Sequence, residues 1–226
     1  MRYIFLDTET TGLDPKNGDR IIEIGCIEMN ERNLSTNTFH EYLHPERTVP
    51  QEAINIHGIT NEFLVGKPLF KEKAQQFIEY IKGSTVIIHN ASFDVGFLDA
   101  ELARLNLMPF NSYVYQVIDS LKEARTLYPG RKNSLDALCD RLEIDRSNRE
   151  YHGALLDCTL LAKVWLAMTR GQDDLLASNT SSNSTSGNKE ELQIANVHDN
   201  GIVLNAKAEE LNEHERLLQK FKISSW

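Results

Sequence analysis

The chain has 226 residues, of which 41% are hydrophobic and 25% are charged, so it is long enough to bury a sizeable core. No segment approaches the roughly 20 consecutive apolar residues of a membrane-spanning helix, and the N-terminus lacks the long apolar stretch of a signal peptide. The three cysteines are widely spaced, which indicates neither a disulfide framework nor a zinc site. We therefore expect a cytoplasmic protein. Its net charge of −9 argues against a basic surface that holds nucleic acid.

The N-terminal part of the chain predicts three strands. Tyr3–Leu6 is a continuous apolar run, which is typical of a strand buried on both faces. Arg20–Met29 and Thr38–Leu43 follow as two further strands, and the three together indicate an antiparallel meander. The segment VPQEAINIHGIT then predicts an irregular connection that contains a short helix.

From residue 70 onward the patterns of helices and strands alternate. The predicted order is a helix over 70–81, a strand at 85–88, a helix over 92–105, a strand at 114–118, two shorter helices, and a long helix over about 153–168. Ser120 and Glu123 form a capping box for the first short helix, and Asn133 with Asp136 begins the second. Strands followed by alternating strands and helices indicate an α/β fold with a mixed sheet.

The composition changes sharply near the C-terminus. Residues 178–188 (SNTSSNSTSGN) contain no apolar side chain and predict a flexible linker. Beyond them, residues 194–204 predict a hairpin and residues 209–221 an amphipathic helix, which together are too small to bury a core alone. The predicted organisation is a domain over 1–172, a linker over 173–188, and a tail over 189–226 that binds a partner.

Four acids occupy positions where an uncompensated charge is costly. Asp7 and Glu9 come at the carboxyl end of the first strand, two residues apart, so their side chains share one face. Asp94 and Asp157 each interrupt an apolar helical stripe that should face the core. Each acid alone has an ordinary alternative, a polar strand end or a buried acid bonded to backbone. Together they favour a metal cluster, because close carboxylates repel unless a cation or a proton intervenes.

The remaining acids and His152 are assigned differently. Glu101 and Asp140 are interpreted as solvated helix positions, and Asp119 as a strand-end or cap residue. His152 lies five residues before the last of the four acids, which is about 140° around a helix, so it belongs to the loop before that helix, where Gly153 lets the chain break. A loop histidine beside metals can take a proton from an attacking water, whereas alone it would be a cap or surface residue.

Four motifs, in the order DTETTG, HGIT, HNASFD and HGALLD, resemble those of the DEDDh 3′–5′ exonucleases. The runs YPGRKNSLDALCDRLEID and HGALLDCTLLAKVWLAMT are similar to the proofreading subunits of bacterial DNA polymerase III within that family. The resemblance covers the predicted domain, and the tail AEELNEHERLLQKF is similar to the polymerase-binding end of those subunits. It implies a ribonuclease H-like fold, in which helices flank a mixed five-stranded sheet.

The resemblance also implies a reaction. Asp7, Glu9 and Asp157 would hold one divalent metal ion, Asp7 with Asp94 would hold a second, and His152 would deprotonate the attacking water. Because carboxylates suit hard cations, Mg²⁺ or Mn²⁺ is expected. Such a pair activates water and stabilises charge on the scissile phosphate. The products would be nucleoside 5′-monophosphates, released from mispaired DNA 3′ ends.

Six residues are expected, from the same resemblance, to contact the terminal nucleotide: Thr10, Thr11, Gly12, His57, Asn90 and Phe93. A Thr-Gly turn supplies backbone donors, an amide can bind phosphate, and an aromatic ring can stack on a base. His57, Asn90 and Phe93 are expected to line one pocket. The alternatives are a turn residue for His57 and a core residue for Phe93.

Partner binding is expected outside the catalytic domain. Gln172, Asp174, Leu175 and Leu176 resemble a short sliding-clamp-binding motif, whose alternative is a frayed helix end. The resemblance implies that the tail docks on the polymerase catalytic subunit, with anchors at Leu211, Leu218 and Phe221. Whether a small accessory subunit also binds is left open. Two rival functions also remain: an RNA-trimming exonuclease of the ribonuclease T or oligoribonuclease kind, and a non-catalytic scaffold between polymerase and clamp.

Overall fold

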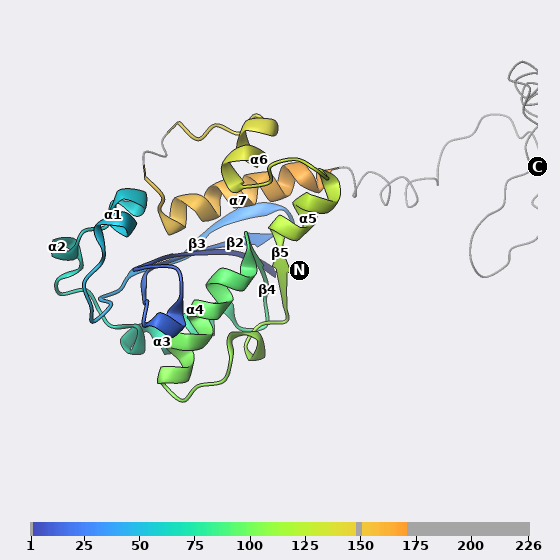
Figure 1. The fold of residues 1–226 in the computed structure, drawn as a ribbon. Helices are drawn as coiled ribbons and strands as arrows, with labels where there is room; N and C mark the ends of the chain where they lie inside the picture. Colours follow the sequence, from blue (N-terminus) through green and yellow to red (C-terminus); the bar gives the residue numbers. More distant parts are fainter. Residues whose placement is uncertain (1, 148–150, 171–226) are drawn as a thin grey trace, which may run out of the picture. The chain divides into compact units, whose positions relative to one another are not determined.

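The computed structural model describes residues 2–147 and 151–170 (Figure 1). The predictions for the C-terminal part of the chain lie outside these residues. They comprise the clamp motif at Gln172, Asp174, Leu175 and Leu176, the linker, the hairpin, and the anchors Leu211, Leu218 and Phe221.

Five strands form one mixed sheet with the order β3-β2-β1-β4-β5. Their bounds are β1 Arg2–Thr10, β2 Ile21–Asn30, β3 Asn33–Tyr42, β4 Thr85–Ile88 and β5 Gln116–Asp119. β1 pairs antiparallel with β2, and β2 pairs antiparallel with β3, which confirms the predicted meander. β4 and β5 are parallel to β1, so the sheet is mixed as expected.

Helices cover both faces of this sheet (Figure 1). Their bounds are α1 Gln51–His57, α2 Asn61–Leu64, α3 Phe70–Ile81, α4 Ala91–Arg104, α5 Ser120–Leu127, α6 Leu135–Arg141 and α7 Ala154–Met168. α3 and α4 pack on one face, and α7 packs on the other, where α5 and α6 join it. The described part of the chain contains no helix long and apolar enough to span a bilayer.

The continuous apolar run of β1 is explained by burial on both faces. Ile4 and Leu6 join the core beneath α3 and α4, whereas Phe5 between them joins the core beneath α7. All three side chains are fully buried. Because side chains alternate along a strand, the residues that continue β1 also divide between these two faces, and this division places the polar residues of the site.

Three sequence predictions need correction. The cap of α5 is Asp119, which accepts from the backbone N–H groups of Leu121 and Lys122, so Ser120 is not the cap that the predicted capping box requires. Ser134, rather than Asn133, caps α6. Glu101 is not solvated: it is only 3% exposed.

The buried Glu101 forms a bidentate ion pair with Arg20, at 2.6 and 2.9 Å. Arg20 immediately precedes β2 and is far from Glu101 in the sequence. The pairing raises the pKa of the Arg20 guanidinium. The buried charge of Glu101 is thus compensated by a partner from another part of the chain.

Candidate active site

β1 brings Asp7 and Glu9 to the face that α7 covers. Both residues lie within the strand, which runs to Thr10, and as alternate residues they point the same way as Phe5. Glu9 is 9% exposed, and Asp7 contributes to the wall of a cavity. The predicted juxtaposition of these two carboxylates is therefore present in the fold.

Asp94 reaches the same edge of β1 from the opposite face. β4 pairs with β1 along Tyr3–Phe5, and Thr8 lies beyond this paired stretch. The Asp94 carboxylate takes the place of a strand there, because it accepts from the Thr8 N–H at 3.0 Å and from the Thr8 hydroxyl at 2.8 Å. Asn90 allows α4 to begin directly after β4, since it adopts a left-handed conformation with φ of 68° that asparagine tolerates.

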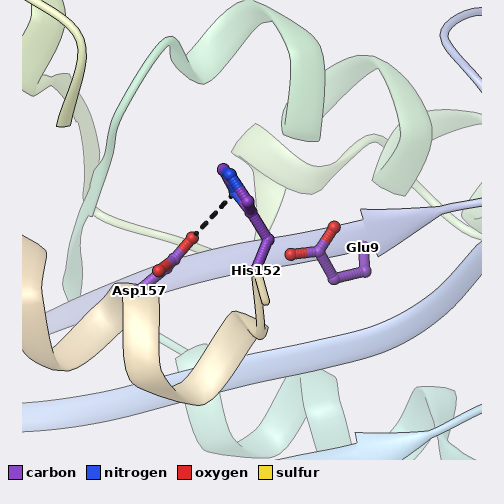
Figure 2. Close-up of side chains that lie close together, drawn as sticks. All are labelled: Glu9, His152 and Asp157. Carbon is purple, nitrogen blue, oxygen red and sulfur yellow. Dashed lines mark ion pairs between the residues drawn. The ribbon is translucent and has the colours of Figure 1, made fainter. Parts of the chain in front are cut away.

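Asp157 and His152 enter the site from α7 and from the loop before it. Asp157 lies in the first turn of α7 and is 4% exposed. His152 lies in the preceding loop, as predicted, and its N–H donates to the Ile56 carbonyl at 3.1 Å. Its Nδ1 lies 3.4 Å from the Asp157 carboxylate (Figure 2). Gly153 has an extended backbone with φ of −153°, a conformation that any residue can adopt. The break between the loop and α7 therefore does not depend on the conformational freedom of glycine.

The ligand atoms of three residues converge. One atom each from Glu9, His152 and Asp157 lies within 4.8 Å of the other two, and Figure 2 shows the side chains gathered between β1 and α7. Burial raises the pKa of Asp7 well above its usual range, and the nearby Asp94 and Glu9 carboxylates raise it further. A cluster with this repulsion and with oxygen-rich donors suits a hard divalent cation.

The pKa of Asp94 is also raised, but by burial acting against hydrogen bonds. Burial raises its pKa to about 7, although the hydrogen bonds from Thr8 act in the opposite direction. In the absence of a cation, Asp94 and Asp7 therefore resist being ionised together. The four acids predicted from the sequence are brought to one place, at the junction of β1, α4 and α7.

Two cavities adjoin the acids, and Phe93 lines both of them. The larger cavity has a volume of about 450 Å³, and among its lining residues are Glu9, Thr10, Thr11, Gly12, His57 and Phe93. The second has a volume of about 390 Å³ and is lined by Asp7, His89, Asn90, Phe93, Ser134, Leu135, Asp136, His152 and Asp157. Asn90 and Phe93 thus line the second cavity together, as expected, whereas His57 lines the larger one.

His57 is built into the wall of the larger cavity. It ends α1 and is 6% exposed. Its Nδ1 accepts from the Ile59 N–H at 3.0 Å, so the proton resides on Nε2, which makes no hydrogen bond to another described residue. Burial lowers the pKa of His57, and the imidazole is therefore neutral at pH 7. Because Nε2 is enclosed by the protein, a bound molecule could accept from it only if the surrounding residues moved.

Asp19 organises the turn after β1, and sequence reasoning missed it. Its carboxylate accepts from the Thr11 hydroxyl at 3.2 Å and from the Asp14 N–H at 3.2 Å. A Cβ on Gly12 would meet this carboxylate at 2.3–2.6 Å, so any larger residue there would displace the Asp19 side chain. Thr8 and Glu23 were missed as well. The available signal for Glu23 was an acid within the apolar run RIIEIGCIEM.

Known proteins resemble the chain over most of its length. Residues 4–165 match the sequence profile of the family described as Exonuclease. A Pasteurella multocida protein called DNA polymerase III subunit epsilon is 49% identical over 218 residues, covering 94% of this chain and 86% of that protein. The protein of the same name from Escherichia coli is 51% identical over 179 residues, covering 77% of this chain and 74% of that protein.

The fold is also found among solved structures. Exonuclease X in complex with 5′-overhanging duplex DNA aligns with a TM-score of 0.59 and 25% identity, over 76% of this chain and 93% of that chain. The five-stranded sheet and its flanking helices therefore agree with the fold of this structure. The chain belongs to the exonuclease family, and within it to the DNA polymerase III epsilon subunits.

Proposed function

We propose that the chain removes nucleotides one at a time from DNA 3′ ends and proofreads for a bacterial replicative polymerase. The observation that carries this proposal is the convergence of Glu9, His152 and Asp157 within 4.8 Å of one another, beside a cavity of about 450 Å³. The convergent groups supply acid–base and metal-ligand chemistry, and the cavity has the size of a small-ligand pocket.

The acids fit a pair of divalent cations. Asp7, Glu9 and Asp157 would hold one, Asp7 with Asp94 would hold the other, and Mg²⁺ or Mn²⁺ suits these oxygen ligands. When bound, two such cations activate water and stabilise the charge that builds on a phosphate. The raised pKa values of Asp7 and Asp94 support this assignment, because added positive charge favours the ionised carboxylates.

His152 would take the proton from the attacking water. Its side chain is 46% exposed and borders the second cavity, while Nδ1 lies 3.4 Å from Asp157. A histidine that is accessible and adjacent to carboxylates can accept a proton and pass it to solvent. The loop that carries it is fixed to α1 through the Ile56 carbonyl.

The terminal nucleoside would occupy the larger cavity. Phe93 lines both cavities, so a nucleotide bound against it would place its base in the larger cavity and its phosphate near the acids. The aromatic ring supports base stacking. The Thr10–Gly12 turn offers backbone groups, and His57 forms part of the cavity wall.

Delivery to DNA would depend on partners, because the net charge of −9 leaves little affinity for phosphates. The relatives from P. multocida and E. coli are named as subunits of DNA polymerase III, which supports the polymerase as a partner. We infer that residues 189–226 dock on the catalytic subunit. The linker at 173–188 raises the effective concentration of the nuclease at the primer end, and Gln172–Leu176 would contact the sliding clamp.

Digestion of a single-stranded DNA with Mg²⁺ tests the activity, and an RNA of the same sequence tests the RNA-trimming rival. The proposal expects faster hydrolysis of the DNA, with nucleoside 5′-monophosphates as products. Asp157→Ala should be inactive, while Asp140→Ala, which removes an exposed acid on α6, should retain full activity. A clear preference for RNA would favour the rival enzyme, and absence of hydrolysis would favour a scaffold.

A further inference from the structure

Glu23 is a buried acid next to the proposed active site, with no role so far in the reaction. It lies on β2 and is 2% exposed. One carboxylate oxygen lies 2.7 Å from His40 Nε2, and the other accepts from the Ala154 N–H at 3.1 Å. The carboxylate therefore joins β2 to β3 and to the first residue of α7.

The contact with Ala154 supplies a cap that α7 otherwise lacks. Gly153 occupies the N-cap position and has no side chain to offer. The first N–H groups of a helix have no partners within it, and the helix end carries partial positive charge. A carboxylate from β2 satisfies one of these groups, and it holds the helix end against the sheet.

The strand and the helix are unusually close at this point. A Cβ on Gly25 would lie 2.5 Å from the Ala154 carbonyl carbon and from the Leu155 nitrogen. One turn further along, the Cys158 thiol donates to the Gly25 carbonyl at 3.1 Å. The first turn of α7 thus rests directly on β2, beside the contact between Glu23 and Ala154.

The placement of Glu23 also has an electrostatic cost. Glu23 is directly opposite Glu9 in the pairing of β1 with β2, so the two carboxylates share a face. The Glu23 carboxylate is also one of the charges that raise the pKa of Asp7. Glu23 therefore adds repulsion to the proposed metal site, which an apolar residue would not do. This cost is explained if the carboxylate is needed for its contact with Ala154.

We propose that Glu23, held by His40, is a positioning residue that fixes the first turn of α7. His152 lies two residues before Ala154, and Asp157 lies three residues after it, within this turn. Their distance from Glu9 on β1 is set by the contact between Glu23 and Ala154. This inference rests on the proposed exonuclease reaction, in which these groups act together.

Glu23→Ala and Glu23→Gln test the inference in the full-length chain, and Glu28→Ala is a matched control. Glu28 lies on the same strand, is 8% exposed, and is held by Arg2 at 2.7 Å, but it pairs in register with Ile4 at the far end of β1. The measurements are kcat and KM on single-stranded DNA with Mg²⁺, the melting temperature, and NMR amide exchange at Ala154 and Leu155.

We expect Glu23→Ala to lower kcat about 10–100-fold, because small displacements of reacting groups have effects of this size. KM should change by less than about threefold, and amide exchange at Ala154 should accelerate. Glu23→Gln keeps an acceptor for the Ala154 N–H but loses the charge. Its kcat should therefore lie between those of Glu23→Ala and the wild type. Glu28→Ala should lower the melting temperature and leave kcat unchanged.

Several outcomes would overturn the inference. They are a normal kcat in Glu23→Ala, a similar loss of kcat in Glu28→Ala, or a loss without faster exchange at Ala154. If Glu23→Ala does not fold, Glu23→Gln and His40→Ala decide, and normal kcat in both overturns it. A fully active wild type together with an active Glu23→Ala rejects this inference alone, whereas an inactive wild type rejects the proposed function.

Discussion

Replacing Asp94 by asparagine should stabilise the metal-free protein at neutral and higher pH. Burial raises the pKa of Asp94 from 3.8 to about 7. A raised pKa means that the stability contributed by the protonated acid is complete below about pH 4 and is lost as the pH rises towards 7. Asparagine keeps an oxygen that can accept from the Thr8 N–H and hydroxyl, which the acid accepts at 3.0 and 2.8 Å, but it carries no charge.

The magnitude follows from the shift. A difference of about three pH units, at about 1.4 kcal/mol each, corresponds to about 4 kcal/mol at pH 8. Asp7 lies close by and shares part of this repulsion, so we expect about 2–4 kcal/mol. For a domain of this size that corresponds to an increase in melting temperature of roughly 5–15 °C.

Thermal unfolding in EDTA between pH 4 and pH 8 measures the effect. The Asp94→Asn variant should match the wild type near pH 4 and exceed it progressively up to pH 8. Added Mg²⁺ should then stabilise the wild type more than the variant, because only the wild type keeps all four ligands. Asp140→Asn, on the exposed surface of α6, controls for the change in net charge. If Asp94→Asn were no more stable than the wild type at pH 8 in EDTA, the reasoning would be wrong.

Three further predictions concern the base, the packing of α7 and the tail. His152→Ala should lower kcat by about 10²–10⁴, while binding of Mg²⁺ and DNA persists in calorimetry; a change in affinity alone would make His152 a binding residue. Gly25→Ala should destabilise the fold by about 1–3 kcal/mol or more in urea unfolding, because its Cβ would meet the backbone of α7 at 2.5 Å. Gly96→Ala, with open space around it, should not. A chain ending before Lys189 should still digest short single strands but no longer co-purify with the polymerase, and tight retention in a pull-down would contradict the tethering proposal.

The acids of the site could be predicted because each breaks a local pattern. Asp94 and Asp157 interrupt apolar helical stripes, and Asp7 with Glu9 ends an apolar strand run. Periodicity of this kind depends on neighbours within a few residues, so it survives without any knowledge of the tertiary fold. The same local information places His152 in a loop, because it cannot share a helix face with Asp157.

Interactions between distant elements could not be predicted in this way. Glu23 and Ala154 are 131 residues apart, and Arg20 and Glu101 are 81 apart. A local pattern does not indicate whether an acid on a helix is buried with a partner or exposed to solvent. For this reason Glu101 was assigned to solvent.

Digestion of a primer with a mismatched 3′-terminal nucleotide tests the central claim most directly. The terminal nucleotide carries a radioactive 5′-phosphate, and the products are separated after incubation of the full-length chain with Mg²⁺. The proposed function predicts that the label is released first, as a free nucleoside 5′-monophosphate, and that Asp157→Ala releases none. Release of the label as a longer oligonucleotide, or equal release by Asp157→Ala, would contradict a 3′–5′ exonuclease that acts through these acids.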